Sequence, residues 1–384
     1  MKRVSRVNLG EVARESKLKA ADGEQLPTVG LEHLDPGDVE LHRWDESKES
    51  TFTKRFLPGQ VLFGRRRAYL QKAVVAPFEG VCSGDITVIE AIAGKISERL
   101  LPFVVQNPAL FDFAVEKSAG SLSPRVKWAR LSEFEFDLPS ESEQEELANT
   151  LWASQRVKSH YRALIQASDD LVKSRFIEMF GTQYEFAKWD VARVEDVADV
   201  TVGVVIKPAQ YYVEDSSTGI KAFRSLNVGP MKIKDADWVY FSAEGNKKNS
   251  KSILQEGDVL IVRSGYPGTS CVVPAKYAGS NAIDLIIARP NMAVIEPGYL
   301  CAFNNYPHGQ QQIQQGVGGA AQQHFNVGKY KKMKIPVPPI NLQRGFVSFA
   351  NQVNKSKFAL QKTLDDLDAM TRKLMSEELG LGNV

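Results

Sequence analysis

The chain has 384 residues, more than one domain of ordinary size and enough for two or three. It is 43% apolar and 24% charged, as globular proteins are, and no apolar run approaches about 20 residues, so we expect no transmembrane helix. A net charge of +2 argues neither for nor against a nucleic-acid partner, so any DNA-binding surface must be local.

The beginning of the chain and its cysteines indicate a compartment. The segment MKRVSRVNLGEVARESK is charged throughout and has no apolar core, so we expect no signal peptide. The three cysteines, Cys82, Cys271 and Cys301, are too few and odd in number for a disulfide framework. Both features favour the reducing cytoplasm.

A basic cluster stands out in the first region, residues 1–138. Residues 54–72 contain six basic side chains, no acidic one, and interleaved aromatics. Such a cluster neutralises phosphates in DNA complexes, although an exposed edge strand also carries basic residues to block aggregation. If residues 65–67 are a strand, Arg65 and Arg67 face one side and Arg66 the other. The predicted DNA contacts here are Lys54, Arg55, Arg65, Arg66, Arg67, Tyr69 and Lys72.

A long helix is predicted over residues 139–181. The segment after Pro139 lacks Pro and internal Gly, Ser142 and Glu145 have capping-box spacing, and Gly181 is placed to end the helix. Apolar residues recur at helical spacing. Those expected to pack against a partner helix are Tyr161, Leu164 and Leu171.

The next region, residues 182–337, again mixes strand and helix patterns. Four segments carry side chains of the types that pair with base edges or phosphates: FRSLNVG, EGNKKNSKS, IVRSGYPGTS and GVGGAAQQHFN. The last of these aligns with SAGSLSPRVKWA around Gly120, which contributes Arg125 and Lys127. The further predicted DNA contacts are Arg224, Ser225, Asn227, Lys247, Lys248, Arg263, Ser264, Tyr266, Gln322 and Gln323.

A second long helix is predicted over residues 338–384, with Asn341 as N-cap and Gly380 as the stop. Its predicted packing positions are Leu360, Leu364, Leu367 and Leu374. Each predicted helix has about 38 residues and therefore a length of about 57 Å, at 1.5 Å per residue. An apolar stripe of this length requires a partner, and the simplest partner is the other helix, running antiparallel.

The two halves of the chain repeat each other. LVKSRFIEMFG from Leu171 matches MTRKLMSEELG from Met370 at an offset of 199, and the same offset relates Pro139 to Pro338 and Gln144 to Gln343. PGQVLFGRRRAYLQKAVVA resembles EGDVLIVRSGYPGTSCVVPA with the offset changed by one. We therefore predict an α+β protein: two similar mixed α/β domains separated by a long antiparallel two-helix coiled coil, with pseudo-two-fold symmetry.

The order of variable domain, long helix, variable domain, long helix resembles the specificity subunit of type I restriction-modification systems. VPPINLQRGFVSFANQVNKSKFALQKTLDDLDAMTRKLMSEELG looks like the C-terminal helical region of that family. LPSESEQEELANTLWASQ with LVKSRFIEMFG looks like the central one, and GQVLFGRRRAYLQKAVVAPFEGVCSGD is similar to a segment of its target-recognition domains. The resemblance implies target-recognition domains at 1–138 and 182–337 and spacer helices at 139–181 and 338–384.

The resemblance also implies a function. The chain would be a non-catalytic DNA-recognition subunit that reads a bipartite sequence in double-stranded DNA, one part per domain. It would dock two methyltransferase subunits and, through them, restriction and translocase subunits, with no membrane partner. No cofactor is expected in this chain, since S-adenosylmethionine would belong to the methyltransferase, and ATP and Mg to the restriction partner.

The residues themselves give no catalytic motif. GQVLFGRR has the glycine spacing of a phosphate loop without its Lys-Ser/Thr, and NPAL lacks the second Pro and the aromatic of the amino-methyltransferase motif. The five histidines show no HExxH pattern and no cysteine at metal-ligand spacing, so we expect neither a metal site nor catalytic residues.

Three alternatives remain open from the sequence. The chain could be a stand-alone DNA-binding regulator of the same architecture, or an uncharacterised nuclease or methyltransferase. It could also be a structural spacer whose domains bind protein.

Overall fold

The computed structural model describes residues 5–21, 24–46, 51–120, 123–182, 188–318 and 324–381. The chain forms two compact units, which we call unit 1 (Met1–Leu164 with Leu360–Val384) and unit 2 (Ile165–Ala359). Each unit takes in part of both long helices. Among the described helices, none is long and apolar enough to cross a membrane.

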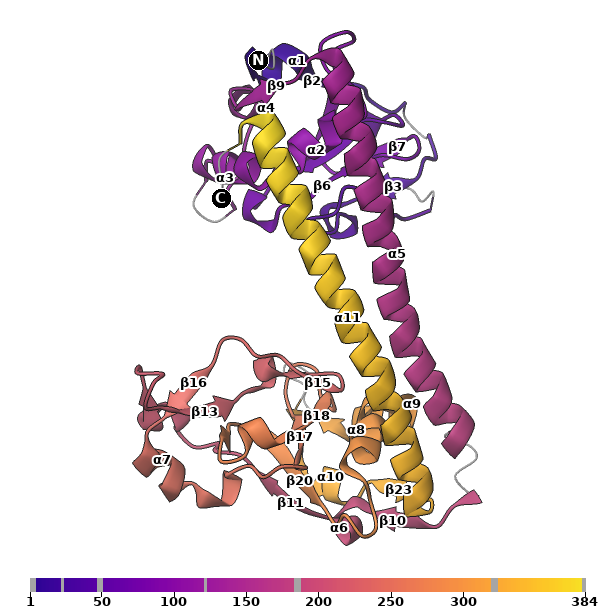
Figure 1. Cartoon of the computed structure of the whole chain (residues 1–384), viewed down its shortest axis with the longest axis vertical. Coiled ribbons are helices and arrows are strands. Elements are labelled where there is room, and N and C mark those ends of the chain that lie inside the picture. Colours follow the sequence, from indigo (N-terminus) through magenta and orange to yellow (C-terminus); the bar gives the residue numbers. More distant parts are fainter. Residues whose placement is uncertain are drawn as a thin grey trace. The chain divides into compact units, whose positions relative to one another are not determined.

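Unit 1 is built on a four-stranded antiparallel sheet (Figure 1). Its strands, in spatial order, are β2 (Ala13–Glu15), β8 (Ile86–Ala91), β5 (Val61–Gly64) and β6 (Ala73–Val75). Side chains of β5 alternate between two cores: Val61 and Phe63 enter one and Leu62 the other. Both faces of this strand are therefore covered.

The remaining elements of unit 1 surround this sheet. A three-stranded sheet consists of β3 (Thr28–Val29), β7 (Gly80–Cys82) and β4 (Lys54–Phe56), and β1 (Ser5–Asn8) pairs with β9 (Glu135–Leu138). The short helices are α1 (Leu9–Val12), α2 (Leu101–Val105), α3 (Pro108–Glu116) and α4 (Trp128–Leu131).

Unit 2 repeats this plan. Its four-stranded sheet has the order β11 (Ala198–Val202), β20 (Leu285–Pro290), β17 (Val259–Val262) and β18 (Ser270–Val272). The second sheet consists of β12 (Tyr212–Val213), β16 (Val239–Phe241), β13 (Ile220–Phe223) and β19 (Asn281–Ala282). As β1 pairs with β9, so β10 (Val191–Arg193) pairs with β23 (Lys334–Pro336).

Smaller elements complete unit 2. Two strand pairs are β14 (Val228–Gly229) with β15 (Lys232–Ile233), and β21 (Val317–Gly318) with β22 (His324–Phe325). The short helices are α6 (Val194–Val197), α7 (Ala243–Lys248), α8 (Pro297–Asn305), α9 (Pro307–Gly316) and α10 (Val327–Lys331). The predicted α+β class and the internal repeat are both confirmed.

The long helices are α5 (Glu141–Phe180) and α11 (Ile340–Leu379), each of 40 residues, or about 60 Å. Gly181 and Gly380 follow them with φ of 88° and 59°, which confirms both predicted stops. The predicted starts are wrong. Ser140, not Ser142, caps α5, because the Glu143 carboxylate accepts hydrogen bonds from the backbone and hydroxyl of Ser140. Asn341 lies inside α11.

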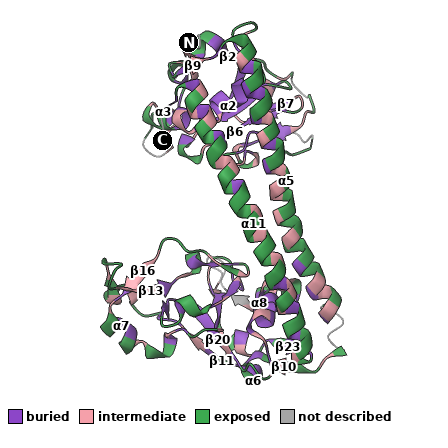
Figure 2. Ribbon diagram, viewed as in Figure 1, coloured by how far each residue is buried: buried purple, intermediate pink, exposed green. Residues whose placement is uncertain are grey.

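The ends of both helices are buried in the cores of the units (Figure 2). In unit 1, Leu147 and Leu151 near the start of α5 share a core with Met375 and Leu379 at the end of α11. In unit 2, Val172, Phe176 and Phe180 at the end of α5 share a core with Phe346 and Ala350 near the start of α11.

The predicted packing positions along the helices are partly corrected. Leu364 is buried, and Tyr161, Leu360, Leu367 and Leu374 are partly buried. Leu164 and Leu171 are more than half exposed, so they are not buried packing positions. Helical spacing identified an apolar face, but it could not distinguish positions covered by a neighbouring element from positions facing water.

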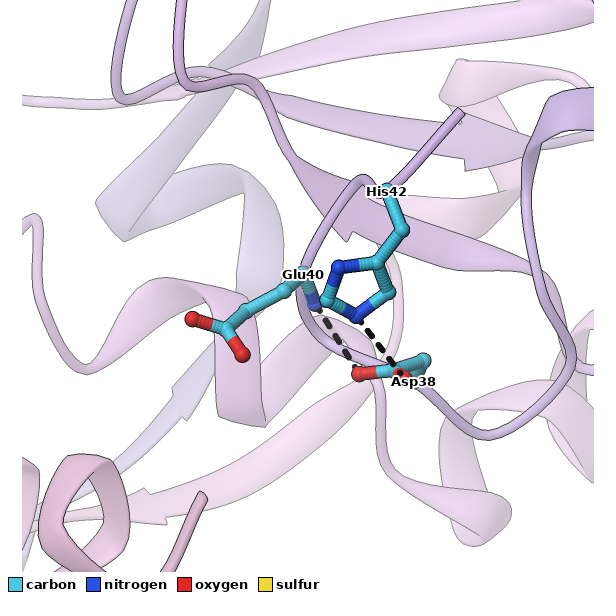
Figure 3. A group of neighbouring side chains, drawn as sticks. All are labelled: Asp38, Glu40 and His42. Atoms are coloured by element: carbon cyan, nitrogen blue, oxygen red, sulfur yellow. Dashed lines mark hydrogen bonds and ion pairs between the residues drawn. The ribbon is translucent and has the colours of Figure 1, made fainter. Parts of the chain in front are cut away.

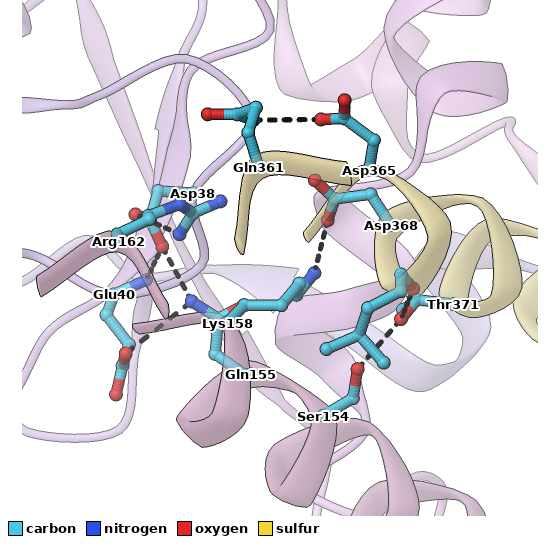
Figure 4. A network of polar contacts seen from close by, with 11 residues as sticks. Asp38, Glu40, Ser154, Gln155, Lys158, Arg162, Gln361, Asp365, Asp368 and Thr371 are labelled. Atoms are coloured by element: carbon cyan, nitrogen blue, oxygen red, sulfur yellow. Dashed lines mark hydrogen bonds and ion pairs between the residues drawn. The ribbon is translucent and has the colours of Figure 1, made fainter. Parts of the chain in front are cut away.

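Polar pairs, which the apolar pattern did not predict, join the helices. In unit 1 the buried ammonium of Lys158 on α5 lies 3.0 Å from the Asp368 carboxylate on α11, and Ser154 and Thr371 hydroxyls lie 2.8 Å apart (Figure 4). In unit 2, Lys357 on α11 pairs with Asp169 on α5. The two ion pairs are equivalent at the offset of 199, with the helices exchanged. They fix an antiparallel register in each unit.

The repeated glutamines also have equal roles. The amide of Gln144 donates to the Pro139 carbonyl at 3.0 Å, and its oxygen accepts from the Ser97 backbone at 2.8 Å. Gln343 donates to the Pro338 carbonyl at 2.7 Å and accepts from the Glu296 backbone at 2.9 Å. Each buried glutamine therefore forms hydrogen bonds with two backbone groups, one carbonyl just before the start of its long helix and one amide of a neighbouring segment.

We predict that Asp368→Asn lowers the free energy of unfolding by about 1–3 kcal/mol, because it leaves the buried Lys158 ammonium without its carboxylate. The equivalent Asp169→Asn should cost less than about 1 kcal/mol, since its carboxylate is half exposed. Urea unfolding of the full chain measures both. Equal losses would contradict the difference in burial as the cause.

Candidate nucleic-acid interface

Three segments of unit 1 meet where β5 ends. Asp85 immediately precedes β8, Arg66 follows β5, and Arg125 lies before α4. The Asp85 carboxylate accepts from the Arg125 guanidinium at 2.7 Å and lies 3.3 Å from the Arg66 guanidinium. Arg66 and Arg125 also form a backbone bridge. One carboxylate thus aligns two arginines from segments far apart in the sequence.

Charge in this cluster is unbalanced. Hydrogen bonding from Arg125, assisted by Arg66, lowers the pKa of the Asp85 carboxyl below its ordinary value despite partial burial. Arg66 also donates to the Ser123 hydroxyl at 2.6 Å. Two guanidiniums on one carboxylate leave a local positive charge on a rigid support.

Further cations stand next to this cluster. Arg67 and Lys127 are exposed, and their side chains make no ion pair or hydrogen bond with the described residues. Tyr69 is also exposed. The expected strand alternation at residues 65–67 is wrong, because β5 ends at Gly64 and Arg67 has a φ of 54°. Of the triplet, Arg67 is the side chain directed to solvent, while Arg65 and Arg66 are partly buried.

The other members of the predicted basic cluster are engaged within unit 1. The Lys54 ammonium donates to the Ile86 carbonyl at 2.6 Å, and the Lys72 ammonium to the Leu31 carbonyl at 2.7 Å. Arg55 bonds the carboxylates of Glu79 and Glu24. These acids are distant in the sequence, so the stretch without acidic residues is not a surface of free cations.

Unit 2 has an equivalent cluster where β17 ends. Arg263 is only 8% exposed. Its guanidinium lies 2.6 Å from the carboxylate of Asp284, the residue immediately before β20. It also lies 2.6 Å from Nε2 of His324, whose Nδ1 is 2.8 Å from the Ser264 hydroxyl. Because a guanidinium only donates, Nε2 of His324 accepts and Nδ1–H donates to Ser264.

The backbone confirms that the two clusters are equivalent. The Val126 amide donates to the Arg65 carbonyl at 3.0 Å, and the Phe325 amide donates to the Arg263 carbonyl at 2.8 Å. Unit 1 has Asp85 and Arg125 where unit 2 has Asp284 and His324. Sequence reasoning missed Asp85, Ser123, Asp284 and His324. The signal that could have found them is an aspartate just before the corresponding strand of each repeat.

The remaining predicted residues of unit 2 divide into buried and exposed. Asn227 is fully buried, donates to the Ala236 carbonyl at 2.7 Å and cannot read a base. Arg224 donates to the Asp237 carbonyl. Lys247 and Lys248 are exposed at the end of α7, Ser225 is exposed in a short 3-10 helix (Ser225–Asn227), and Tyr266 is exposed in the turn after β17. Gln322 and Gln323 lie outside the described residues.

A group of possible metal ligands lies elsewhere in unit 1. Ligand atoms of Asp38, Glu40 and His42 lie within 4.8 Å of one another (Figure 3). The buried Asp38 carboxylate accepts from Gln155 at 2.8 Å and from Arg162 at 3.1 Å, both on α5 (Figure 4). The Arg162 cation balances the carboxylate, so this arrangement attaches the loop to α5. The spacing of His and Cys residues in the sequence did not indicate this group of Asp38, Glu40 and His42.

Comparisons with known proteins add the family. A family model described as "Type I restriction modification DNA specificity domain" matches residues 187–367. The type I restriction enzyme EcoDI specificity subunit of Escherichia coli is 27% identical over 123 residues, which is 30% of this chain and 27% of that protein. The match therefore spans about a quarter of that relative.

Solved structures share the fold along the whole chain. The type I restriction-modification S subunit from M. genitalium is 11% identical with a TM-score of 0.56, covering 100% of this chain and 97% of that one. A chain from a structure of a type I R-M system, described for complex assembly and conformational transition, is 18% identical with a TM-score of 0.51, covering 98% and 97%. The specificity-domain match thus confirms, over residues 187–367, the resemblance seen in the sequence to type I restriction-modification specificity subunits, and the solved structures share the fold of the whole chain.

Proposed function

We propose that this chain recognises a bipartite sequence in double-stranded DNA, with each unit reading one part. The observation that carries the proposal is the recurrence of an aspartate-centred polar cluster at equivalent strand ends: Arg66–Asp85–Arg125 in unit 1 and Arg263–Asp284–His324 in unit 2. The arginine after the strand differs by one position, because Arg263 corresponds to Arg65, and Ser264 to Arg66. Each cluster supports exposed loops. The loops of unit 1 carry Arg67 and Lys127, and a loop of unit 2 carries Tyr266. Sequence-specific readers combine such rigid supports with cations that contact phosphates.

The proposal assigns the chemistry to other chains. Two methyltransferase subunits, carrying S-adenosylmethionine, would dock on the helices, and restriction and translocase subunits, using ATP and Mg, would join through them. Exposed apolar side chains on the helices support a docking role: Leu171 and Met370, equivalent at the offset of 199, are both more than half exposed. We place this activity in the cytoplasm, where the DNA target lies.

We predict that Arg67→Ala with Lys127→Ala weakens DNA binding and reduces its salt dependence. Each lost phosphate contact lowers the slope of log K against log salt by about 0.9, so the double variant should lose about 1.8. Fluorescence anisotropy with duplex DNA across a salt series measures the slope. Lys95→Ala is the control, because Lys95 is exposed beyond the opposite end of β8. An unchanged slope in the folded double variant would exclude this surface.

We predict that the pure full chain does not transfer a labelled methyl group from S-adenosylmethionine to DNA. Transfer should require the partner methyltransferase, with which the chain should form a stoichiometric complex. Methyl transfer by the single chain would overturn the proposal. A chain that binds DNA but no methyltransferase would instead be a stand-alone regulator.

We predict that the helices set the spacing between the two half-sites. The variant lacks seven residues from 159–168 and the equivalent seven from 358–367, so it retains both interhelical ion pairs. Because seven residues make nearly two helical turns, the apolar faces on either side of each deletion stay aligned. The deletion shortens each helix by about 10 Å, or about three base pairs of DNA. Sequencing of methylated adenines in a host carrying the variant and its methyltransferase should show unchanged half-sites with a spacer about two to four base pairs shorter. An unchanged spacer in an active variant would contradict this role.

A further inference from the structure

Large apolar side chains are exposed at one edge of unit 2. Ile206 is 78% exposed, Leu226 62% and Tyr266 84%. Exposure of single apolar residues is ordinary, but these three lie on separate loops that converge on one structural point. That point is Asp284, the carboxylate of the polar cluster.

Backbone hydrogen bonds establish the convergence. The Asp284 amide donates to the Val204 carbonyl at 3.2 Å, which places the loop carrying Ile206 beside Asp284. The Ile283 amide donates to the Phe223 carbonyl at 2.8 Å, which places the loop carrying Leu226 on the same edge. Tyr266 follows Ser264, whose hydroxyl bonds His324 of the cluster.

The loops are shaped to present these side chains. Lys207, next to Ile206, has a φ of 46°, a left-handed conformation that is unfavourable for a residue with a side chain. Gly265 and Gly268 flank the Tyr266 turn with φ of 87° and 89°. A Cβ on Gly268 would lie 2.5 Å from the Gln310 amide nitrogen and 2.6 Å from the Ile313 side chain, so the turn packs closely on α9.

The polar side chains of the cluster itself are already occupied, whereas Lys207 and Ser225 on the neighbouring segments are exposed. All three nitrogens of the Arg263 guanidinium bond Phe325, Asp284 or His324. Asn227 is buried and bonded to Ala236, and Arg224 bonds the Asp237 carbonyl. The equivalent edge of unit 1, by contrast, presents the cations Arg67 and Lys127. Apart from Lys207, the large exposed side chains of unit 2 at this edge are therefore the apolar Ile206, Leu226 and Tyr266.

We infer that unit 2 reads its half-site through apolar contacts of Ile206, Leu226 and Tyr266 with the 5-methyl groups of thymines in the major groove. This inference rests on the proposed function, because it takes duplex DNA as the ligand of the edge. The thymine methyl is the apolar group that a base pair presents in the major groove, and guanine readout normally uses an Arg or Lys that is free to donate. The half-site of unit 2 therefore contains A·T pairs.

The test begins with selection of duplexes from a random pool by the full chain, which defines the two half-sites. Uracil, which lacks the methyl, then replaces thymine in one half-site at a time, and affinity is measured for the wild type, Ile206→Ala, Leu226→Ala and Tyr266→Ala. We expect each contacted methyl to contribute about fourfold in affinity. Uracil should weaken wild-type binding in one half-site, and at least one variant should lose that sensitivity.

Met292→Ala is the matched control. Met292 is an exposed apolar side chain of unit 2 beyond the opposite end of β20, so this variant should keep the uracil sensitivity of the wild type. Wild-type binding that is indifferent to uracil in both half-sites would overturn the inference and leave the proposed function intact. So would a sensitivity that persists undiminished in all three variants. A chain that selects no sequence at all would overturn the proposed function itself.

Discussion

The structure depends on the burial of both ends of both long helices. A 40-residue amphipathic helix has an apolar face that must be covered at its beginning and at its end. Leu147 and Leu151 complete the core of unit 1 together with Met375 and Leu379, while Phe176, Phe180 and Phe346 lie in the core of unit 2. Neither core is complete without a segment from each helix, so neither unit is a continuous stretch of the chain.

The stretches between these ends are held differently. Lys158 with Asp368 and Lys357 with Asp169 are ion pairs between antiparallel helices, and each excludes a shift in register that would leave its charges unpaired. Such pairs contribute less to stability than to the choice of one alignment. If the helix length sets the spacing of two DNA half-sites, a unique register is the property that function requires.

The two polar clusters show how one scaffold can carry two chemistries. Both place an aspartate just before a central strand and join it to the segment after the neighbouring strand. Unit 1 adds Arg125 and keeps exposed cations nearby, whereas unit 2 adds His324, occupies its buried Arg263 and exposes apolar side chains. The two units share the aspartate-centred cluster, and they differ in the side chains that the nearby loops expose.

Local patterns in the sequence determined the architecture. The offset of 199, the helix-ending glycines and the apolar periodicity predicted two repeats and two long antiparallel helices, because capping, turn formation and amphipathicity depend on residues close in the chain. The site depended on contacts between distant residues. Arg55 and Asn227 were both predicted to contact DNA, but Arg55 is paired with Glu24 and Glu79, and Asn227 is buried. Leu164 and Leu171 match the helical spacing but are mostly exposed. Which side chains are bonded and which face water is decided by the elements that fold over them, and only the tertiary structure brings those elements together.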